Sequence, residues 1–191
     1  MKCLVAGGAG FIGSHHVDRL IKEGHKVVVI DNLSTGKKEN LNPKAKFYKL
    51  DIRDPEISQI FSREEPEIVF HYAAQIDVRK SVKDPIGDAK INILGTLNLL
   101  ENCREFKIKK VIFASSGGAI YGDADIVPTP ENYPEWPLSP YGIAKLTIDK
   151  YLNYYYQVFG LLYISLRFAN VYGPRQDSKG EAGVVAIFCV S

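Results

Sequence analysis

Two side chains in the second half of the chain could together move a proton. Tyr141 and Lys145 lie four residues apart in Tyr-Gly-Ile-Ala-Lys, so on a helix they face the same way. A lysine ammonium beside a phenol lowers the phenol pKa from about 10 toward neutral pH, which makes the phenol a usable acid/base. With 11 tyrosines in the chain, about one such pair arises by chance, so its place in the fold must decide its meaning.

A glycine-rich segment near the N-terminus could bind a phosphate group. Gly7, Gly10 and Gly13 follow a short apolar run and open an amphipathic one, the strand–turn–helix context of a dinucleotide-binding loop. In this context backbone N–H groups and the helix dipole meet a pyrophosphate. The context makes the motif specific, because three spaced glycines alone are a weak signal.

Two aspartates that follow later apolar runs could reach the adenosine. Asp31 lies 18 residues after Gly13, where a carboxylate accepts hydrogen bonds from the ribose hydroxyls and repels a 2′-phosphate. Asp31 therefore favours NAD over NADP, whereas the nearby Lys37 and Lys38 would favour NADP. Asp51 is placed to meet the adenine edge, and an ordinary strand-end cap is its alternative role.

A pair of serines could supply a hydroxyl to a substrate oxygen. Ser115 and Ser116 directly follow the apolar run 111–114, and ligands of parallel α/β sheets bind at the carboxyl ends of the strands. Both serines are candidates.

The elements that position these residues alternate along the chain. Consecutive apolar positions predict buried parallel strands over 3–6, 27–30, 47–50, 68–70, 111–114 and 163–166. Helical spacing predicts helices over 11–23, 57–63, 88–106 and 141–159. Such alternation predicts an α/β fold, a Rossmann-type doubly wound parallel sheet with helices on both faces. The Pro-rich stretch 127–140 is expected to be an irregular loop.

Composition excludes several other classes of protein. With 191 residues, 46% apolar and 24% charged, the chain has roughly the length of one domain and is not a disordered or fibrous sequence. A net charge of +2 without a basic stripe argues against nucleic-acid binding. The three cysteines have no disulfide or metal-ligand spacing, and no apolar run approaches the ~20 residues of a membrane span. We therefore expect a cytoplasmic protein without a metal site.

The end of the chain predicts a second, incomplete unit. A polar loop over 176–183 leads into the apolar run 184–190, which lacks a partner in the remaining sequence. We expect an NAD-binding domain over 1–174, and over 175–191 the start of a smaller, truncated substrate lobe.

Several further segments share the pattern of a known family. These segments are 31–36, 71–74, 91–96, 139–142 and 166–174. Together with the glycines and Tyr141–Lys145, they resemble the extended short-chain dehydrogenase/reductase family, and most closely its nucleotide-sugar 4-epimerases of the UDP-glucose 4-epimerase type. The resemblance covers essentially the whole chain.

The resemblance implies a role for each matching residue. Tyr141 is then the acid/base, Lys145 its partner and a ligand of the nicotinamide ribose, and Ser116, preferred over Ser115, the hydrogen-bond donor to the reacting oxygen. The implied NAD ligands are Gly7, Gly10, Phe11, Ile12, Gly13, Asp31, Asn32, Thr35, Gly36, Asp51, Ile52, Tyr72, Ala73, Ala74, Asn92, Ala114, Ser115, Tyr141, Lys145, Phe168 and Val171. The implied substrate ligands are Gln75, Ser116, Tyr141 and Asn170.

The implied activity is NAD-dependent epimerisation at C4 of a UDP-sugar through a 4-keto intermediate. Related dehydratases and decarboxylases carry carboxylates where this chain has Gly118 and Ala119, which disfavours an elimination. A dehydrogenase or reductase on another nucleotide sugar, and an NAD-binding fragment without activity, remain alternatives, and the sugar stays open. In this family the helices near 88–106 and 141–159 commonly form a homodimer seam, which is the expected partner contact.

Overall fold

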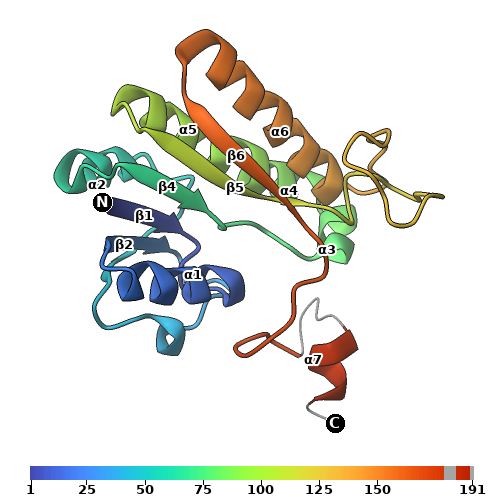
Figure 1. Cartoon of the computed structure of the whole chain (residues 1–191), viewed down its shortest axis with the longest axis horizontal. Coiled ribbons are helices and arrows are strands. Elements are labelled where there is room, and N and C mark those ends of the chain that lie inside the picture. The colour runs from blue at the N-terminus through green and yellow to red at the C-terminus, as the bar shows by residue number, and fades with distance from the viewer. Residues whose placement is uncertain (179–183, 190–191) are drawn as a thin grey trace.

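A six-stranded parallel sheet forms the centre of the computed structural model, which describes residues 1–178 and 184–189 (Figure 1). The strands are β1 (Lys2–Ala6), β2 (Lys26–Asp31), β3 (Lys46–Lys49), β4 (Ile68–His71), β5 (Lys110–Ser116) and β6 (Leu162–Phe168). Their order in the sheet is β3-β2-β1-β4-β5-β6, and each neighbouring pair is parallel. This is the strand order of the doubly wound dinucleotide-binding fold, so the predicted fold class is confirmed.

The central strands form because their apolar runs are buried on both faces of the sheet. In β1, Leu4 and Ala6 belong to one apolar cluster, whereas Val5 between them belongs to a second cluster on the opposite face. Alternate residues of a strand point to opposite faces, so a run without polar residues needs helices on both sides.

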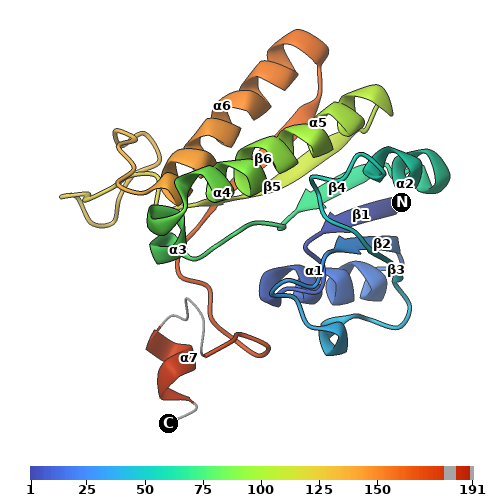
Figure 2. The same cartoon turned by 180° about the vertical axis from the view of Figure 1, so that it is seen from behind.

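Helices cover the two faces unequally. α1 (Phe11–Lys22) packs on one face, and the other is covered by α2 (Ile57–Glu64), α5 (Thr96–Glu105) and α6 (Pro140–Phe159), as the two opposite views show (Figures 1 and 2). Because α6 lies on β5 and β6, the helix that carries Tyr141 is held against the strand that ends in the two serines.

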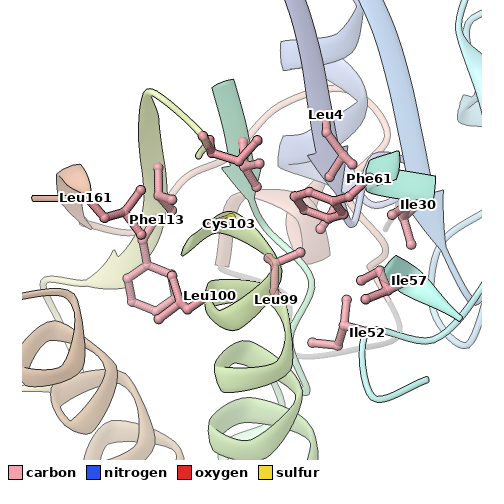
Figure 3. Packing of buried hydrophobic residues seen from close by; sticks show 14 of the residues in the cluster. Leu4, Ile30, Ile52, Ile57, Phe61, Leu99, Leu100, Cys103, Phe113 and Leu161 are labelled. Carbon is pink, nitrogen blue, oxygen red and sulfur yellow. The ribbon is translucent and has the colours of Figure 1, made fainter. Parts of the chain in front are cut away.

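The larger core cluster fixes this packing. Figure 3 shows Leu4, Ile30, Ile57 and Phe61 gathered near β1 and β2. On α5, Leu99 points toward this group, and Leu100 lies beside Phe113 of β5. Most of these side chains are completely buried. Each contributes about 1.5–3 kcal/mol relative to an exposed side chain, so α5 and the sheet form a rigid support.

The helix predicted over 88–106 is divided in the structure, which corrects that prediction. α4 (Pro85–Ala89) begins earlier, a π-helical segment η2 (Lys90–Gly95) follows, and α5 starts at Thr96. Inside η2 the buried Asn92 turns its amide toward the backbone of Gln75. A widened turn that presents one side chain is a usual function of π segments.

Three short elements were not predicted from the sequence: η1 (Lys38–Asn40), α3 (Val78–Lys83) and α7 (Val184–Phe188). The Pro-rich loop is irregular through Ser139, as expected, and α6 begins at Pro140. The apolar run predicted over 184–190 is helical in its described part, while 179–183 and 190–191 lie outside the described residues. Within the described ranges, no helix is long and apolar enough to cross a membrane.

Candidate functional site

The glycine-rich turn between β1 and α1 brings backbone very close to backbone. Gly7 has a φ of +83°, and a Cβ there would lie 2.4 Å from the Ala73 nitrogen. A Cβ at Gly13 would lie 2.2 Å from the carbonyl oxygen of Gly7. A methyl group does not fit at either position, so the turn itself requires both glycines.

The start of α1 is suited to an anionic group. Gly10 is the N-cap residue and has no side chain that could accept a hydrogen bond from the first amides of the helix. The first turn also has no acidic residue of its own, so it offers no carboxylate to offset the positive end of the helix dipole. This end follows β1 at the point where the strand order reverses between β1 and β4, the usual place of a bound dinucleotide.

Asp31 is held firmly beside this turn. Its Oδ2 accepts a hydrogen bond from the Ala9 amide at 3.0 Å, and its Oδ1 accepts one from the Leu33 amide at 2.8 Å. Gly36 lies directly against the carboxylate, because a Cβ there would be 2.8 Å from Oδ1. The predicted ribose ligand is therefore oriented by the loops on both sides of it.

The other predicted adenosine ligands lie near Asp31, but the side chain of Ile52 points away from a nucleotide. Asn32 donates to Asp51 at 2.7 Å, and Arg53 binds the same carboxylate at 2.8 Å. The hydrogen bonds from Arg53 hold the pKa of Asp51 well below its usual range. The side chain of Ile52 is buried in the core, so only its backbone can face a nucleotide.

Tyr141 and Lys145 lie together at the start of α6. Ser139 caps the helix by accepting a hydrogen bond from the Gly142 amide at 3.1 Å, so Tyr141 lies in the first turn. The Lys145 Nζ lies 5.7 Å from the centre of the Tyr141 ring and donates to the Ala114 carbonyl at 2.6 Å. The predicted pair thus faces the carboxyl end of β5.

Lys145 is a buried cation. It is 5% exposed, and burial lowers the pKa of its ammonium to about 8, against the opposing effect of the Asp149 and Asp88 carboxylates. At neutral pH the side chain therefore remains mostly protonated.

The two candidate serines have different surroundings. The Ser115 hydroxyl donates to Asp149 of α6 at 3.1 Å and is buried. The Ser116 hydroxyl oxygen accepts from the Ala119 amide at 3.1 Å, and its side chain is only half-buried. Because the hydrogen bond at Ser116 uses the oxygen alone, its proton can be offered to a ligand.

Gln75, Asn92 and Asp88 form a hydrogen-bonded network next to the site. The Asn92 amide exchanges two bonds with the Gln75 backbone at 2.8 and 2.9 Å and donates to Asp88 at 2.9 Å. The Gln75 side chain bonds Asp77 and Asp88. For Gln75, predicted as a substrate ligand, and Asn92, predicted as an NAD ligand, these bonds would have to be exchanged or shared.

The segment after β6 reaches back to α1. Figure 1 shows the course of its backbone. His15 meets the Pro174 carbonyl at 2.8 Å, and Arg175 donates to Asp18 at 2.7 Å. The segment therefore passes from the second half of the sheet to the first, across the carboxyl ends of β1 and β4, where the strand order reverses. Asn170 and Val171 are exposed on it.

The remaining predicted ligands line the same end of the sheet. Tyr72 bonds His16 through its hydroxyl, Ala73 approaches Gly7, and Thr35 is exposed in the loop after β2. The other predicted ligands at this end are Phe11, Ile12, Ala74, Ala114 and Phe168.

Sequence reasoning missed three polar residues near the site: Asp88 and His71, which are buried, and Asp149, which is partly buried. The spacing held a signal for two of them, since Asp149 is one helical turn beyond Lys145 and Asp88 one turn before Asn92. His71 ends β4, and its ring contacts Thr96 at 2.8 Å. Burial, and secondarily the charge of Lys145, lowers the pKa of His71 to about 3.

His71 makes the stability of the fold dependent on pH. In the unfolded chain this residue takes up a proton at a pKa of 6.5, whereas in the folded chain it does so only at about 3. The stability of the fold therefore decreases as the pH is lowered from 6.5 toward 3. From pH 7 to pH 5 the loss is about 2 kcal/mol. In thermal melts, His71→Gln is expected to reduce the drop in Tm between these two pH values. An equal drop in Tm in the original protein and in His71→Gln would contradict this role. The difference between their Tm values at pH 7 measures the effect of the substitution on packing.

Comparison with known proteins shows the family of the chain. Residues 3–189 match the NAD dependent epimerase/dehydratase family, and the chain belongs to that family. It is 57% identical to the UDP-glucose 4-epimerase of Thermotoga maritima, solved with UDP-glucose, with a TM-score of 0.96 over 98% of this chain and 62% of that one. The Thermus thermophilus UDP-glucose 4-epimerase, solved with NAD, is 50% identical with a TM-score of 0.95, covering 98% of this chain and 61% of that one.

A relative in Mycolicibacterium smegmatis, a UDP-glucose 4-epimerase, is 48% identical over 193 residues, which covers 98% of this chain and 62% of the relative. The chain thus spans about three fifths of the length of the proteins it matches. The family resemblance predicted from the sequence is confirmed.

Proposed function

We propose that this protein binds NAD and interconverts the C4 epimers of a UDP-sugar. The observation that carries the proposal is the position of Tyr141 and Lys145 at the carboxyl end of β5. The Gly7–Gly13 turn lies at the same end of the parallel sheet. The family and the epimerases solved with UDP-glucose and with NAD support it. Residues 1–174 would form the NAD-binding domain and 175–191 the start of the substrate lobe.

The residues of the chain fit NAD at each part of the molecule. The turn at Gly7–Gly13 and the start of α1 accommodate the pyrophosphate, and Asp31 accommodates the adenosine ribose. Asp31 is the reason to expect NAD rather than NADP, because a carboxylate repels a 2′-phosphate. When bound, NAD would accept a hydride from C4 of the sugar and return it to the opposite face.

The proton chemistry falls to Tyr141. In the proposed reaction its phenolate takes the proton of the C4 hydroxyl and gives it back after the sugar has turned over. The Lys145 ammonium, held at the Ala114 carbonyl, stabilises the phenolate by its charge. Ser116 donates a hydrogen bond to the reacting oxygen. One acid/base is enough, since the proton leaves and returns at the same oxygen.

The loop after β5 supports epimerisation over elimination. An elimination requires a further acid or base beside the sugar, and the loop offers Gly118 and Ala119 at that place. A Cβ at Gly118 would have no atom within 4 Å, so this position leaves space rather than a functional group.

Ser116 and Ser115 give a paired test of this arrangement. The test uses the protein at its full natural length, called here its longest natural form. In that form, Ser116→Ala is expected to lower kcat by about 10- to 100-fold, because a donor to the developing oxyanion is lost. Ser115→Ala removes a hydrogen bond to Asp149 and is expected to lower Tm. Its effect on kcat should be smaller than that of Ser116→Ala. A reversed ranking of the two kcat values would assign the catalytic hydroxyl to Ser115.

Calorimetric titration of the 191-residue chain tests the binding part of the proposal. NAD should bind and NADP should bind more weakly. UDP-sugar should require the longest natural form if residues after 174 supply most of its contacts. Failure of NAD to bind would refute the proposal, and NAD binding without any sugar turnover in the longest form would favour an NAD-binding protein. We also propose a homodimer through the helices near 88–106 and 141–159, and sedimentation measures whether the protein is a dimer.

A further inference from the structure

Two carboxylates near Lys145, the buried Asp88 and the partly buried Asp149, have no part in the proposed reaction. Asp88 on α4 is 2% exposed, and α4 packs against α6. Asp149 lies one turn beyond Lys145 on the same side of α6. Within the described part of the chain, the Nζ hydrogen bond of Lys145 goes to the Ala114 carbonyl. The carboxylates therefore act on the ammonium through space.

Asp88 is only partly satisfied by its neighbours. Its Oδ1 accepts from Asn92 at 2.9 Å and from Gln75 at 3.0 Å. Its Oδ2 is buried and has no hydrogen-bond partner among residues 1–178 and 184–189. A buried carboxylate with a free oxygen is costly unless an opposite charge lies nearby, and Lys145 is the buried cation of this region.

Asp149 joins three elements below the site. Its Oδ1 accepts from Ser165 of β6 at 2.6 Å, and its Oδ2 accepts from Ser115 of β5 at 3.1 Å. Arg167 of β6 approaches the same carboxylate at 3.7 Å. The carboxylate is thus fixed in place between the two strands and the helix that carries Lys145.

We propose that Asp88 and Asp149 are positioning residues of the acid/base site, which hold the Lys145 ammonium in its buried position as its two counter-charges. An uncharged Lys145 could not stabilise a phenolate at Tyr141, so both carboxylates would act on catalysis through the lysine. Both also raise the pKa of Lys145 against the effect of burial.

In the described part of the chain, few other charged groups lie on the elements that pack around Lys145. The ring of His71 on β4 is neutral at physiological pH because burial lowers its pKa to about 3. From β6, Arg167 faces Asp149 and also Glu135 of the loop before α6. On α5, Glu101 bonds Tyr155, far along α6 from Lys145. The cations on α3 and η2 are exposed; they are Arg79, Lys80, Lys83 and Lys90.

Titration of Lys145 in the 191-residue chain tests the proposal without any turnover. In NMR with carbon-13 at the lysine ε position, the Lys145 signal is identified by its loss in Lys145→Met. Asp88→Asn should move its titration down by about one pH unit, and Asp149→Asn should act in the same direction. The matched control is Asp84→Asn, which neutralises an exposed helix-capping carboxylate on the neighbouring turn. An unchanged titration in either variant overturns the role of that carboxylate.

A double-mutant cycle covers the case in which Asp88→Asn does not fold. Lys145→Met leaves Asp88 as a buried charge without its counter-charge, so adding Asp88→Asn should raise Tm above that of Lys145→Met, by about 3 °C. No recovery in the double variant would overturn the pairing of Asp88 with Lys145.

A kinetic readout rests on the proposed function and is kept separate. In the longest natural form, the basic limb of kcat/KM against pH should move to lower pH in Asp88→Asn, because Lys145 then loses its proton more easily. A uniform fall in rate without this movement would indicate a structural role and count against the proposal. Absence of turnover in the wild-type protein would refute the proposed function and leave the titration result standing.

Discussion

Replacing Tyr141 with phenylalanine is expected to lower the rate of sugar epimerisation by about 10²- to 10⁴-fold. The phenylalanine ring can occupy the same place in the first turn of α6, below the Lys145 Nζ, so the packing is retained. What is lost is the oxygen that exchanges a proton with the C4 hydroxyl. The rate is measured with UDP-galactose in the longest natural form, and NAD affinity by calorimetry should remain nearly unchanged.

Tyr154 provides the matched control for this substitution. It lies on the same helix and is 47% exposed, and Tyr154→Phe removes a hydroxyl without touching the site. Its rate should equal that of the unmodified protein. A near-normal rate in Tyr141→Phe would exclude Tyr141 as the acid/base.

Gly13→Ala is expected to weaken NAD binding by about 100-fold or more. The added Cβ would lie 2.2 Å from the carbonyl oxygen of Gly7 and 2.9 Å from its carbonyl carbon, which are backbone atoms. The turn must open to relieve this contact, and its amides then leave the pyrophosphate position. Calorimetry with NAD measures the loss, and circular dichroism checks that the sheet is retained.

Gly118→Ala is the control for an added methyl group. No atom lies within 4 Å of the position its Cβ would take, so NAD affinity and Tm should remain close to the original values. An unchanged NAD affinity in Gly13→Ala would show that the turn does not hold the cofactor as proposed.

Much of the framework could be predicted because it depends on local patterns. Runs such as Val27–Ile30 are apolar at consecutive positions, which only a strand covered on both faces accommodates. The turn at Gly7–Gly13 could likewise be predicted from its glycines, because a positive φ and close backbone contacts leave no room for another residue. The strand order follows from these units once they are recognised.

The residues that the sequence did not reveal depend on contacts between distant segments. Asp88 bonds Gln75, 13 residues away, and the π segment at Lys90–Gly95 forms around the buried amide of Asn92. Helical spacing alone predicts a regular helix there. The surroundings of Ser115 were equally hidden, because its partner Asp149 lies on α6, 34 residues further on.

The fate of the hydrogen at C4 tests the central claim most directly. UDP-galactose carrying deuterium at C4 is incubated with the full-length protein and an amount of NAD far below that of the sugar, and the sugars are analysed by NMR and mass spectrometry. The account predicts that both C4 epimers form, that deuterium stays at C4, and that no net absorbance develops at the nicotinamide band. Loss of deuterium to solvent, or reduced NAD accumulating in proportion to sugar consumed, would contradict it.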